Sequence, residues 1–409
     1  MITTINNKHK KLNVPNLRFP EFEGEWEEER LSDIADLYKG TGISKDQLSD
    51  EGEPCILYGE LYTKYKSETI EKVISKTNIE NTKLVRSKAN DVIIPCSGET
   101  AEDIATARCV LNDNILLGGD LNIIRLRGYD GIFMSYQLNG KRKYDIAKVA
   151  QGVSVVHLYG EHLKGVKTVN PCLEEQKKIA SLLALLDERI ATQNKIINKL
   201  QSLIKELNDS LYAQYGSEVL TSFANLGTSY PGLSGKSAQD FGSGKPFITY
   251  LNVYSNNVIN ENDFQYVAIK DGEKQNIVEY GDVLFTLSSE TPEEVGIGSV
   301  YLGKGNVYLN SFCFGIHITN TEVAFPPYLS YYVSSTAFRK FIYPYAQGST
   351  RFNLCKADFE KASIKLPTLE NQKRIYSILS HIDSKIETEI QMLYLYNSQK
   401  QYLLRQVFI

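Results

Sequence analysis

The chain repeats one sequence pattern twice, and this internal duplication limits its fold more than any other feature. The segment AQGVSVVHL at 150–158 realigns with AQGSTRFNL at 346–354, and the same spacing carries PCLEEQKKI at 171–179 onto PTLENQKRI at 367–375. Upstream, DVIIPCSGETAEDIA matches DVLFTLSSETPEEVG at a slightly shorter spacing, which indicates small insertions in the loops between matched elements. We therefore expect two copies of one module, each of which ends in a helical segment.

Each copy combines short strands with helices, so the predicted fold class is α+β with two tandem mixed α/β domains. Apolar, β-rich runs such as DVIIP and SFCFGIHI predict short strands. A short helix is expected near 132–148 in the first copy and near 327–343 in the second, where Pro327 suits a first helical turn. Pro171 and Pro367 then mark the start of a long helix in each copy.

Both long helices carry a heptad pattern. Apolar side chains recur at alternating spacings of four and three residues, and the polar interruptions Gln193 and Glu389 are equivalent positions. The first series is Ile179, Leu183, Leu186, Ile190, Gln193, Ile197, Leu200, Ile204, Leu207 and Leu211. The second series is Ile375, Leu379, Ile382, Ile386, Glu389, Leu393, Tyr396, Lys400, Leu403 and Val407. A repeat of this length predicts a coiled-coil seam.

Two tandem modules that each end in one helix can pair their helices within the chain, in antiparallel fashion. This pairing predicts a coiled-coil rod that relates the two modules by a pseudo-two-fold axis. The expected domains are 1–170 and 216–366, with the long helices at 171–215 and 367–409. Pairing of the same seams between two copies of the chain is the alternative.

A rod of this kind suits a ligand with two similar features a fixed distance apart. A helix over 176–212 would extend about 55 Å. Duplex DNA repeats every helical turn, about 34 Å. The rod could therefore hold two readers roughly one turn apart, with an unread spacer between them.

Charge is distributed unevenly along the chain. The net charge of −4 argues mildly against a nucleic-acid-binding protein, but residues 61–170 carry 16 basic and 12 acidic side chains. The positive charge is densest at Lys141, Arg142 and Lys143. A local patch of this kind fits either phosphate contacts or a solvated loop.

Composition and cysteine usage favour a cytoplasmic protein without a membrane partner. Residues 1–13 are polar and basic, unlike a signal peptide, and no apolar run approaches the roughly 20 residues that span a bilayer. The six cysteines form no CxxC pair, so we expect a reduced cytoplasmic setting. Cys313 and His317 share one face of a predicted strand, but two ligands do not make a zinc site.

Several motifs in combination resemble type I restriction-modification specificity subunits. They are PNLRFPEFEGEWEEERLSDIADL at 15–37, the two AQG turns, and the P-x-L-x-x-Q-x-(K/R)-I helix start with its following (L/I)-D-x-(R/K)-I step. The resemblance covers essentially the whole chain. It implies a non-catalytic subunit with two target-recognition domains, each of which reads one half of a bipartite site in double-stranded DNA. It also implies that the long helices dock two modification (methyltransferase) subunits, which use S-adenosylmethionine, and that restriction subunits then join; no cofactor is expected in this chain.

Three segments that occur in both copies are candidate DNA contacts. The first places tyrosines around a polar residue on an expected strand end: Tyr58, Glu60 and Tyr62 in one copy, and Tyr250, Asn252 and Tyr254 in the other. Asn can bond adenine at two atoms and Glu can accept from cytosine N4, although packing at a sheet surface explains the tyrosines equally well. The second is a small polar turn after an apolar strand: Ser97 and Gly98, and Ser288 and Ser289.

The third segment is the AQG turn. It contributes Gln151, Gly152 and Ser154 in the first copy, and Gln347, Gly348, Ser349, Thr350 and Arg351 in the second. Hydroxyls, main-chain amides and an arginine suit phosphate contacts, which position a protein on DNA without specifying sequence. Arg351 and the basic run of Lys141, Arg142 and Lys143 are the preferred candidates for such contacts.

Two catalytic alternatives have weak support. NPCL at 170–173 and FPPY at 325–328 approach the loop with which DNA methyltransferases hold a flipped base, but no glycine-rich cofactor loop accompanies them. A metal-dependent nuclease would need clustered carboxylates with a nearby lysine. The one carboxylate cluster, which lacks such a lysine, comprises Asp91, Glu99, Glu102 and Asp103, echoed by Asp282, Glu290, Glu293 and Glu294. A coiled-coil scaffold with no role on DNA would explain the helices, but not the two divergent modules between them.

Overall fold

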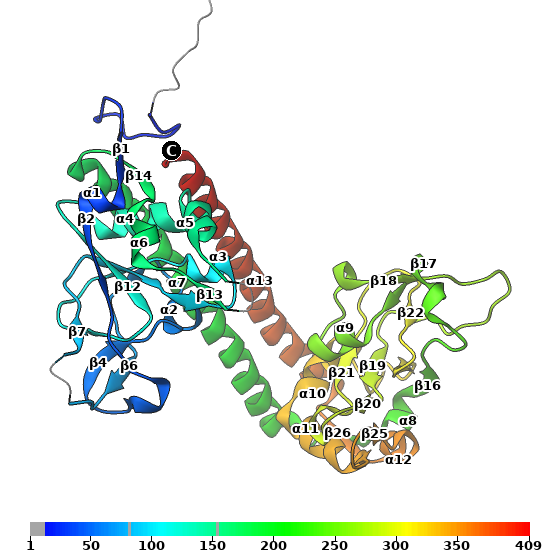
Figure 1. The fold of residues 1–409 in the computed structure, drawn as a ribbon. Helices are drawn as coiled ribbons and strands as arrows, with labels where there is room; N and C mark the ends of the chain where they lie inside the picture. Colours follow the sequence, from blue (N-terminus) through cyan, green and yellow to red (C-terminus); the bar gives the residue numbers. More distant parts are fainter. Residues whose placement is uncertain (1–12, 81–82, 153–154) are drawn as a thin grey trace, which may run out of the picture. The chain divides into compact units, whose positions relative to one another are not determined.

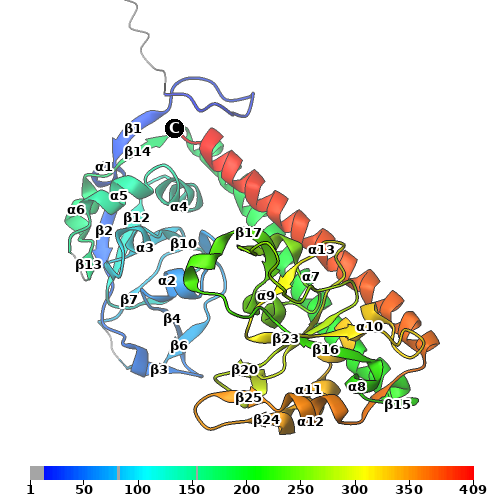
Figure 2. The same cartoon turned by 90° about the vertical axis from the view of Figure 1, so that its right-hand side faces the viewer.

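The computed structural model describes residues 13–80, 83–152 and 155–409, which form two compact units (Figure 1, Figure 2). Unit 1 comprises Met1–Asn194 with Gln391–Ile409, and unit 2 comprises Lys195–Ile390. Each unit therefore joins one module to parts of both long helices. Within the described ranges, no helix is both long enough and apolar enough to cross a membrane.

Unit 1 is built around a five-stranded sheet with the strand order β2-β12-β8-β10-β5, and a second sheet has the order β3-β6-β4-β11-β7. Side chains alternate between the two faces of the first sheet. Val92 and Ile94 pack with Ile146 on the helical side, whereas Ile93 and Ile123 pack toward the second sheet. The strands are β2 (Ala35–Lys39), β12 (Leu121–Leu126), β8 (Asp91–Pro95), β10 (Arg108–Val110), β5 (Thr69–Ile70), β3 (Leu48–Ser49), β6 (Ser75–Thr77), β4 (Glu53–Ile56), β11 (Leu116–Leu117) and β7 (Val85–Arg86).

Unit 2 repeats this plan with fewer strands. Its main sheet has the order β16-β23-β19-β21, and a smaller sheet has the order β18-β17-β22. Val283 and Phe285 pack on the helical side, and Leu284 packs on the opposite side. The strands are β16 (Gly227–Pro231), β23 (Cys313–Ile318), β19 (Val283–Thr286), β21 (Gly298–Val300), β18 (Gln265–Val267), β17 (Phe241–Ile248) and β22 (Tyr308–Leu309).

Smaller elements also occur in both units. In unit 1 they include β1 (Glu27–Arg30), α1 (Leu31–Ile34), η1 (Lys45–Gln47), α6 (Gly160–Lys164) and β14 (Lys167–Asn170). In unit 2 they include β15 (Val219–Thr221), α8 (Phe223–Leu226), η2 (Ala238–Asp240), η3 (Glu261–Asp263), η4 (Pro292–Glu294), η5 (Tyr343–Tyr345), α12 (Lys356–Lys361) and β26 (Ile364–Leu366). β1 pairs with β14 and β15 pairs with β26, so each module closes at matched places in the chain.

Each predicted short helix is in fact two helices. The first copy has α4 (Gly131–Asn139) and α5 (Lys143–Val149), and the second has α10 (Pro326–Ser334) and α11 (Thr336–Ile342). Gly140 ends α4, and Ser335 ends α10 and caps α11 by accepting a hydrogen bond from the backbone of Phe338. Pro327 lies in the first turn of α10, as the sequence predicts.

The long helices α7 (Leu173–Tyr215) and α13 (Leu369–Gln406) pair in antiparallel fashion, as predicted (Figure 1). In unit 1 Ile179 and Leu183, near the start of α7, pack in one cluster with Val407 and Phe408 at the end of the chain. In unit 2 the late part of α7 packs against Leu379, in the early part of α13. The first heptad series is buried or half-buried along its whole length. The chain therefore pairs its two seams with each other.

A buried glutamine anchors the start of each long helix. The side chain of Gln176 accepts a hydrogen bond from the backbone of Asp130 at 3.0 Å and donates to the oxygen of Pro171 at 2.8 Å. Gln372 likewise accepts from the backbone of Phe325 at 2.8 Å and donates to Pro367 at 2.9 Å. Unpaired backbone groups are costly when buried, and these glutamines satisfy several of them at once. This role explains why the helix-start motif contains a glutamine in both copies.

Only unit 1 has a buried ion network at the helix seam among the described residues. The Lys400 ammonium lies 2.6 Å from the Asp187 carboxylate and 2.8 Å from that of Glu68, and the Tyr136 hydroxyl donates to Asp187 at 2.6 Å. The equivalent heptad position in unit 2 is Ile204, which packs against the apolar core. The two seams are therefore alike in geometry but differ in chemistry.

The network makes the stability of unit 1 depend on pH. Burial lowers the pKa of Lys400, but the charges of Glu68 and Asp187 outweigh burial and hold the pKa above its ordinary value. Burial raises the pKa of Glu68, but the charge of Lys400 outweighs burial and lowers it. The contribution of Glu68 is thus present above its unfolded pKa of about 4.3 and is lost as the pH falls through the lower folded value. The contribution of Lys400 is lost only as the pH rises through a folded pKa above about 10.4.

We expect Lys400→Met to lower the free energy of unfolding by about 3–5 kcal/mol at pH 7, because two buried carboxylates lose their cation. At a pH of about 4.5 the loss should shrink, because protonation neutralises the stranded carboxylates. Urea denaturation at both pH values measures the difference. Ile204→Met, at the equivalent position of unit 2, should cost less than about 1.5 kcal/mol at either pH. A loss at Lys400 that does not change with pH would contradict the ion-pair explanation.

Candidate nucleic-acid interface

In unit 2 the three candidate segments meet at one edge of the sheet. β20 (Ser288–Ser289) pairs with β25 (Phe352–Leu354), and β25 also pairs with β24 (Ala346–Gln347). The Tyr250 hydroxyl donates to the backbone oxygen of Ser288 at 2.9 Å, and the Tyr254 hydroxyl donates to Glu294 at 2.7 Å. The tyrosines, the serine turn and the AQG turn are therefore neighbours in space although they are distant in sequence.

Unit 1 brings its own copies of these segments together. β9 (Ser97–Gly98) pairs with β13 (Val156–His157), and Gln151 is bridged to His157. α3 (Ala101–Ile104) follows the serine-glycine turn directly. Burial raises the pKa of Tyr62, as do the nearby Tyr58, Asp103 and Glu99, so the tyrosine segment also lies beside this turn. The same three segments thus assemble one edge in each unit, which we name the recognition edge.

The prediction that the tyrosine segment lies at the end of a strand is wrong. The segment forms a short helix in both units, α2 (Glu60–Thr63) and α9 (Tyr250–Ser255). Thr249 caps α9 by accepting a hydrogen bond from the backbone of Asn252, which favours a helical turn at this place. Alternate residues do not share a face on a helix, as they do on a strand. The central polar residue therefore does not share a face with the two tyrosines, as it would on a strand.

Both central polar residues are buried and engaged with their own unit. The Glu60 carboxylate accepts from the backbone of Leu57 at 3.1 Å, lies 2.6 Å from the Lys64 ammonium, and bonds the Ser75 hydroxyl. Asn252 donates to the backbone oxygen of Asn260 at 2.8 Å and accepts from its backbone nitrogen at 3.0 Å. The hydrogen-bonding groups proposed for adenine and cytosine are thus used to hold neighbouring loops.

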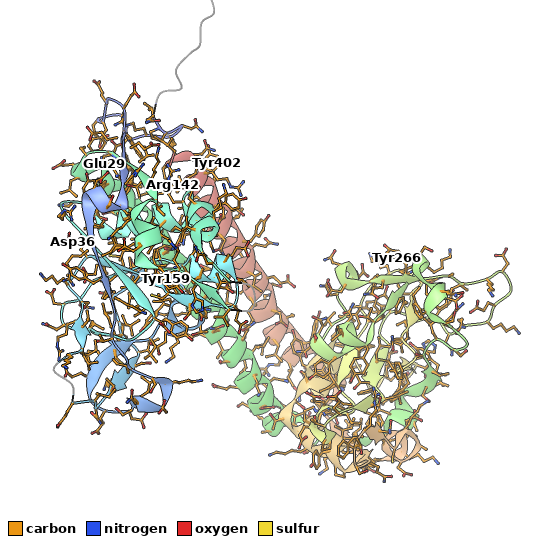
Figure 3. All side chains as sticks on the ribbon, viewed as in Figure 1. Glu29, Asp36, Arg142, Tyr159, Tyr266 and Tyr402 are labelled. Atoms are coloured by element: carbon orange, nitrogen blue, oxygen red, sulfur yellow. The ribbon has the colours of Figure 1, made fainter. Side chains whose placement is uncertain are left out.

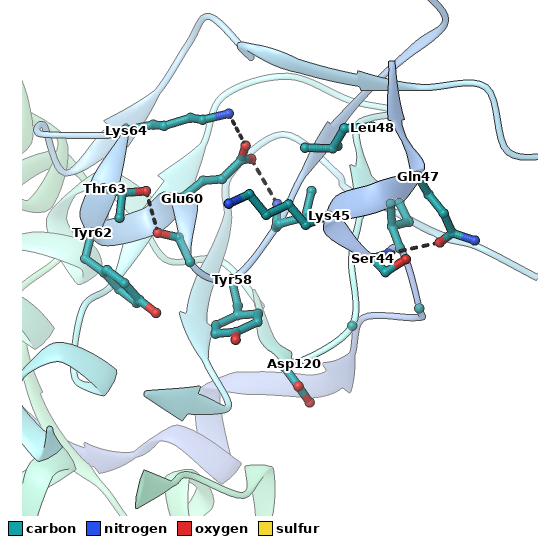
Figure 4. Close-up of a pocket in the computed structure, with 15 residues that line it drawn as sticks. Ser44, Lys45, Gln47, Leu48, Tyr58, Glu60, Tyr62, Thr63, Lys64 and Asp120 are labelled. Carbon is teal, nitrogen blue, oxygen red and sulfur yellow. Dashed lines mark hydrogen bonds and ion pairs between the residues drawn. The ribbon is translucent and has the colours of Figure 1, made fainter. Parts of the chain in front are cut away.

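The tyrosines of unit 1 line a cavity of about 860 Å³ beside this buried glutamate (Figure 4). Tyr58 and Tyr62 contribute from one side, and Lys45 and Gln47 from the short helix η1 contribute from another. Asp120 lies at the same cavity. The close-up shows Tyr58, Tyr62 and Lys45 around this space, and the apolar Leu48 also lines it.

A second hollow of about 350 Å³ lies next to the AQG turn of unit 1. It is lined by Tyr38, Lys39, His157 and Tyr159, and it shares Asp120 with the first cavity. Tyr159, which is labelled in Figure 3, is half-exposed. The centroid of its ring lies 6.2 Å from that of His157. The sequence patterns did not single out this group, because these residues differ from their counterparts in the second copy.

The AQG turns are tight, and their glycines are required. Gly152 and Gly348 have φ angles of +127° and +148°, and a Cβ at either position would lie about 2 Å from a backbone oxygen three residues further on. In unit 2 the turn presents its side chains to solvent, and the guanidinium of Arg351 lies 5.9 Å from the ring centroid of Phe312. The exposed residues of this turn are Gln347, Gly348, Ser349, Thr350 and Arg351. The candidate Ser154 lies outside the described residues.

The basic run at 141–143 is not part of the recognition edge. Arg142 donates to the backbone oxygen of Ile409 at 3.3 Å and lies 3.6 Å from Asp145, so it ties α5 to the end of the chain (Figure 3). Lys141 lines a separate hollow of about 400 Å³ with Lys400 and Arg405. Lys143 begins α5. The positive charge of this run therefore lies beside the end of α13.

Two carboxylates of the nuclease alternative, Asp91 and Asp282, are structural partners of basic side chains. Asp91 binds the Arg125 guanidinium at 2.7 Å, and its equivalent Asp282 lies 2.9 Å from the ring of His317. Burial raises the pKa of Asp282, and burial also raises that of Cys313. Among the residues that the structure describes, no group of three or more His, Cys, Asp or Glu side chains is placed to hold a metal ion.

Comparisons with known proteins agree with this geometry. The family model described as the type I restriction modification DNA specificity domain matches the chain twice, at residues 23–202 and 234–393. The MjaVIII specificity subunit of Methanocaldococcus jannaschii is 27% identical over 200 residues, which are 48% of this chain and 44% of that protein. The putative MjaX specificity subunit of the same organism is 24% identical over 436 residues, which cover 93% of this chain and 92% of that protein.

Two solved structures share the fold. The S subunit of a type I restriction-modification system from M. genitalium superposes with a TM-score of 0.58 at 16% identity, over 97% of this chain and 99% of that one. A chain from a structure of the assembly and conformational transition of the type I system gives a TM-score of 0.57 at 15% identity, over 94% and 97% of the two chains. With the family model matching most of its length in two copies, the chain belongs to the type I restriction-modification DNA specificity family.

Proposed function

We propose that this chain is the specificity subunit of a type I restriction-modification complex and reads a bipartite site in double-stranded DNA. Residues 1–170 and 216–366 act as the two target-recognition domains, and the helical segments 171–215 and 367–409 join them. The observation that carries the proposal is the recognition edge, which both units build from the same three segments. A shared scaffold with different side chains is what two different half-sites require.

The division of labour at the edge follows from side-chain chemistry. Exposed hydroxyls, glycine turns and Arg351 suit contacts to phosphates. The tyrosines and the polar residues that line the cavities of unit 1 suit base edges and sugars. The chain itself is a non-catalytic subunit, and two of the carboxylates of the nuclease alternative, Asp91 and Asp282, are paired within the fold.

The long helices serve as docking surfaces for two modification subunits, which bring S-adenosylmethionine, and restriction subunits join that assembly. Apolar side chains that lie off the heptad seam support this role, because they remain exposed along both helices. They include Leu182, Leu185, Ile196, Leu203, Ile378, Met392 and Leu395. A coiled-coil scaffold without a DNA role would account for these residues, but not for the two matched recognition edges.

We expect deletion of this gene to remove methylation from one split motif in the source organism, two short half-sites around a fixed unread spacer. Sequencing of modified bases with and without the gene measures the change. If the methylomes are identical, the purified chain with its modification subunits should be tested for binding to genomic DNA fragments. A complex that binds no fragment more tightly than its competitors would contradict the proposal.

Arg351→Gln should weaken DNA binding for all sequences to a similar extent, because a phosphate contact positions the protein without reading a base. The slope of log affinity against log salt should fall by about one. Lys304→Gln is the matched control: it removes one exposed positive charge beyond β21, at the opposite end of the same sheet. A change in the recognised sequence, or an equal effect of both substitutions, would argue against a phosphate contact at Arg351.

Insertion of four residues after Ala191 in α7 and after Glu387 in α13 should lengthen the unread spacer by roughly one or two base pairs. Four helical residues add ~6 Å, and a base pair occupies ~3.4 Å. The methylated motif of the variant, compared with that of the wild type, gives the spacer directly. Unchanged spacing would mean that the helices do not set the distance between half-sites.

A further inference from the structure

A matched position lies within the recognition edge of each unit. Asp120 directly precedes β12 in unit 1, and Phe312 directly precedes β23 in unit 2. The strand register makes them equivalent, because the residue after Asp120 is opposite Pro95 and the residue after Phe312 is opposite Thr286. The two positions therefore occupy equivalent places at the ends of the two equivalent sheets.

One backbone hydrogen bond at this position is the same in both units, although the side chain is not. The oxygen of Asp120 accepts a hydrogen bond from the nitrogen of Cys96 at 2.7 Å, and the oxygen of Phe312 accepts from Leu287 at 2.9 Å. Cys96 and Leu287 are the residues just before the small polar turns β9 and β20. Each position is thus fixed to the turn beside it by one backbone hydrogen bond.

The Asp120 carboxylate is available to a ligand. It lines both hollows of the recognition edge, between Tyr58 on one side and His157 on the other. Its side chain is 50% exposed, and its ion pair with Lys39 is long, at 3.7 Å, and itself exposed. Such pairs contribute little in water, so an incoming donor can replace the lysine. Asp120 also has a φ of +59°, a conformation that favours Asn, Asp and Gly over other residues.

Phe312 offers an apolar surface in the same place. The residue is 56% exposed, and the guanidinium of Arg351 in the AQG turn lies over its ring. In a DNA groove, the exposed ring can contact a methyl group while the neighbouring guanidinium contacts a phosphate. The matched positions therefore present a hydrogen-bond acceptor in one unit and an apolar face in the other.

We propose that this position reads one base of each half-site: Asp120 accepts from the N4 amino group of cytosine, and Phe312 contacts the methyl group of thymine. The inference rests on the proposed function and names residues within it. In the major groove cytosine presents its amino donor, whereas adenine places the N7 acceptor next to its amino group, which a carboxylate disfavours. Thymine is the base that carries a methyl group there, and an aromatic ring suits it.

Substitutions at Asp120 distinguish a contact with a DNA base from a role in the stability of the fold. Asp120→Asn keeps the size and the backbone preference of the residue but adds a donor, so the amide can bond both N6 and N7 of adenine. Asp120→Gly removes the side chain without straining the positive φ. Glu71→Gln is the control, because it neutralises an exposed carboxylate just after β5, at the opposite end of the same sheet. Phe312→Ser and Phe312→Leu test unit 2 in the same way.

The experiment uses each variant with its modification subunits in a host that lacks this methylation, and reads the methylated motif by sequencing modified bases. With Asp120→Asn we expect one cytosine of one half-site to become adenine, and with Asp120→Gly we expect about a tenfold loss of discrimination at that base alone. Phe312→Ser should relax a thymine in the other half-site, and Phe312→Leu should retain it. Glu71→Gln should leave the motif unchanged.

Two results would overturn the inference. One is an unchanged motif with Asp120→Gly. The other is loss of all methylation with both Asp120 variants while their melting temperatures match that of Glu71→Gln, which would make Asp120 a support for the backbone rather than a reader. Failure of the proposed function is distinguishable, because the wild-type complex would then give no split motif at all.

Discussion

The arrangement of each unit depends on one buried side chain, the glutamine in the first turn of its long helix. Gln176 and Gln372 each hold the loop that leads into the short helices against the start of the long helix. Apolar burial drives the helices to pack together, but it does little to fix their orientation. The buried amide adds direction, because its donor and acceptor must face particular backbone groups. The orientation of module and helix within a unit follows from that requirement.

The sequence predicted the features that arise from periodicity. The heptad series identified the buried side of both long helices, and the repeat located the segments that meet at the recognition edge. It failed at Tyr58–Tyr62 and Tyr250–Tyr254, because a helix of one turn is too short to show a period and depends on capping by residues such as Thr249. It also could not place Arg142, whose partner lies at the other end of the chain. The sequence did not predict Asp120 as a candidate, because its place at the recognition edge follows from the pairing of β12 with β8.

The two units share geometry more than chemistry. Arg125 and Asp91 in unit 1 correspond to His317 and Asp282 in unit 2, and the cation that Lys400 brings to one seam is replaced by Ile204 in the other. The strand register beside the Asp91 and Asp282 positions is the same in both units. Such a scaffold can accept new side chains at the recognition edge without refolding, which is the property that a reader of changing DNA sequences needs.

The return of α13 to unit 1 has a consequence for biosynthesis. The core that contains Trp26, Phe133 and Leu183 is closed by Val407 and Phe408, and the backbone of Leu17 bonds the oxygen of Gln406. At ordinary rates of translation roughly 10–40 s separate the emergence of Asn194 from that of Gln391. Over that interval the nascent unit 1 has an open apolar face while unit 2 is still being made. The apolar face of unit 1 is therefore completed only when the last helix has been synthesised.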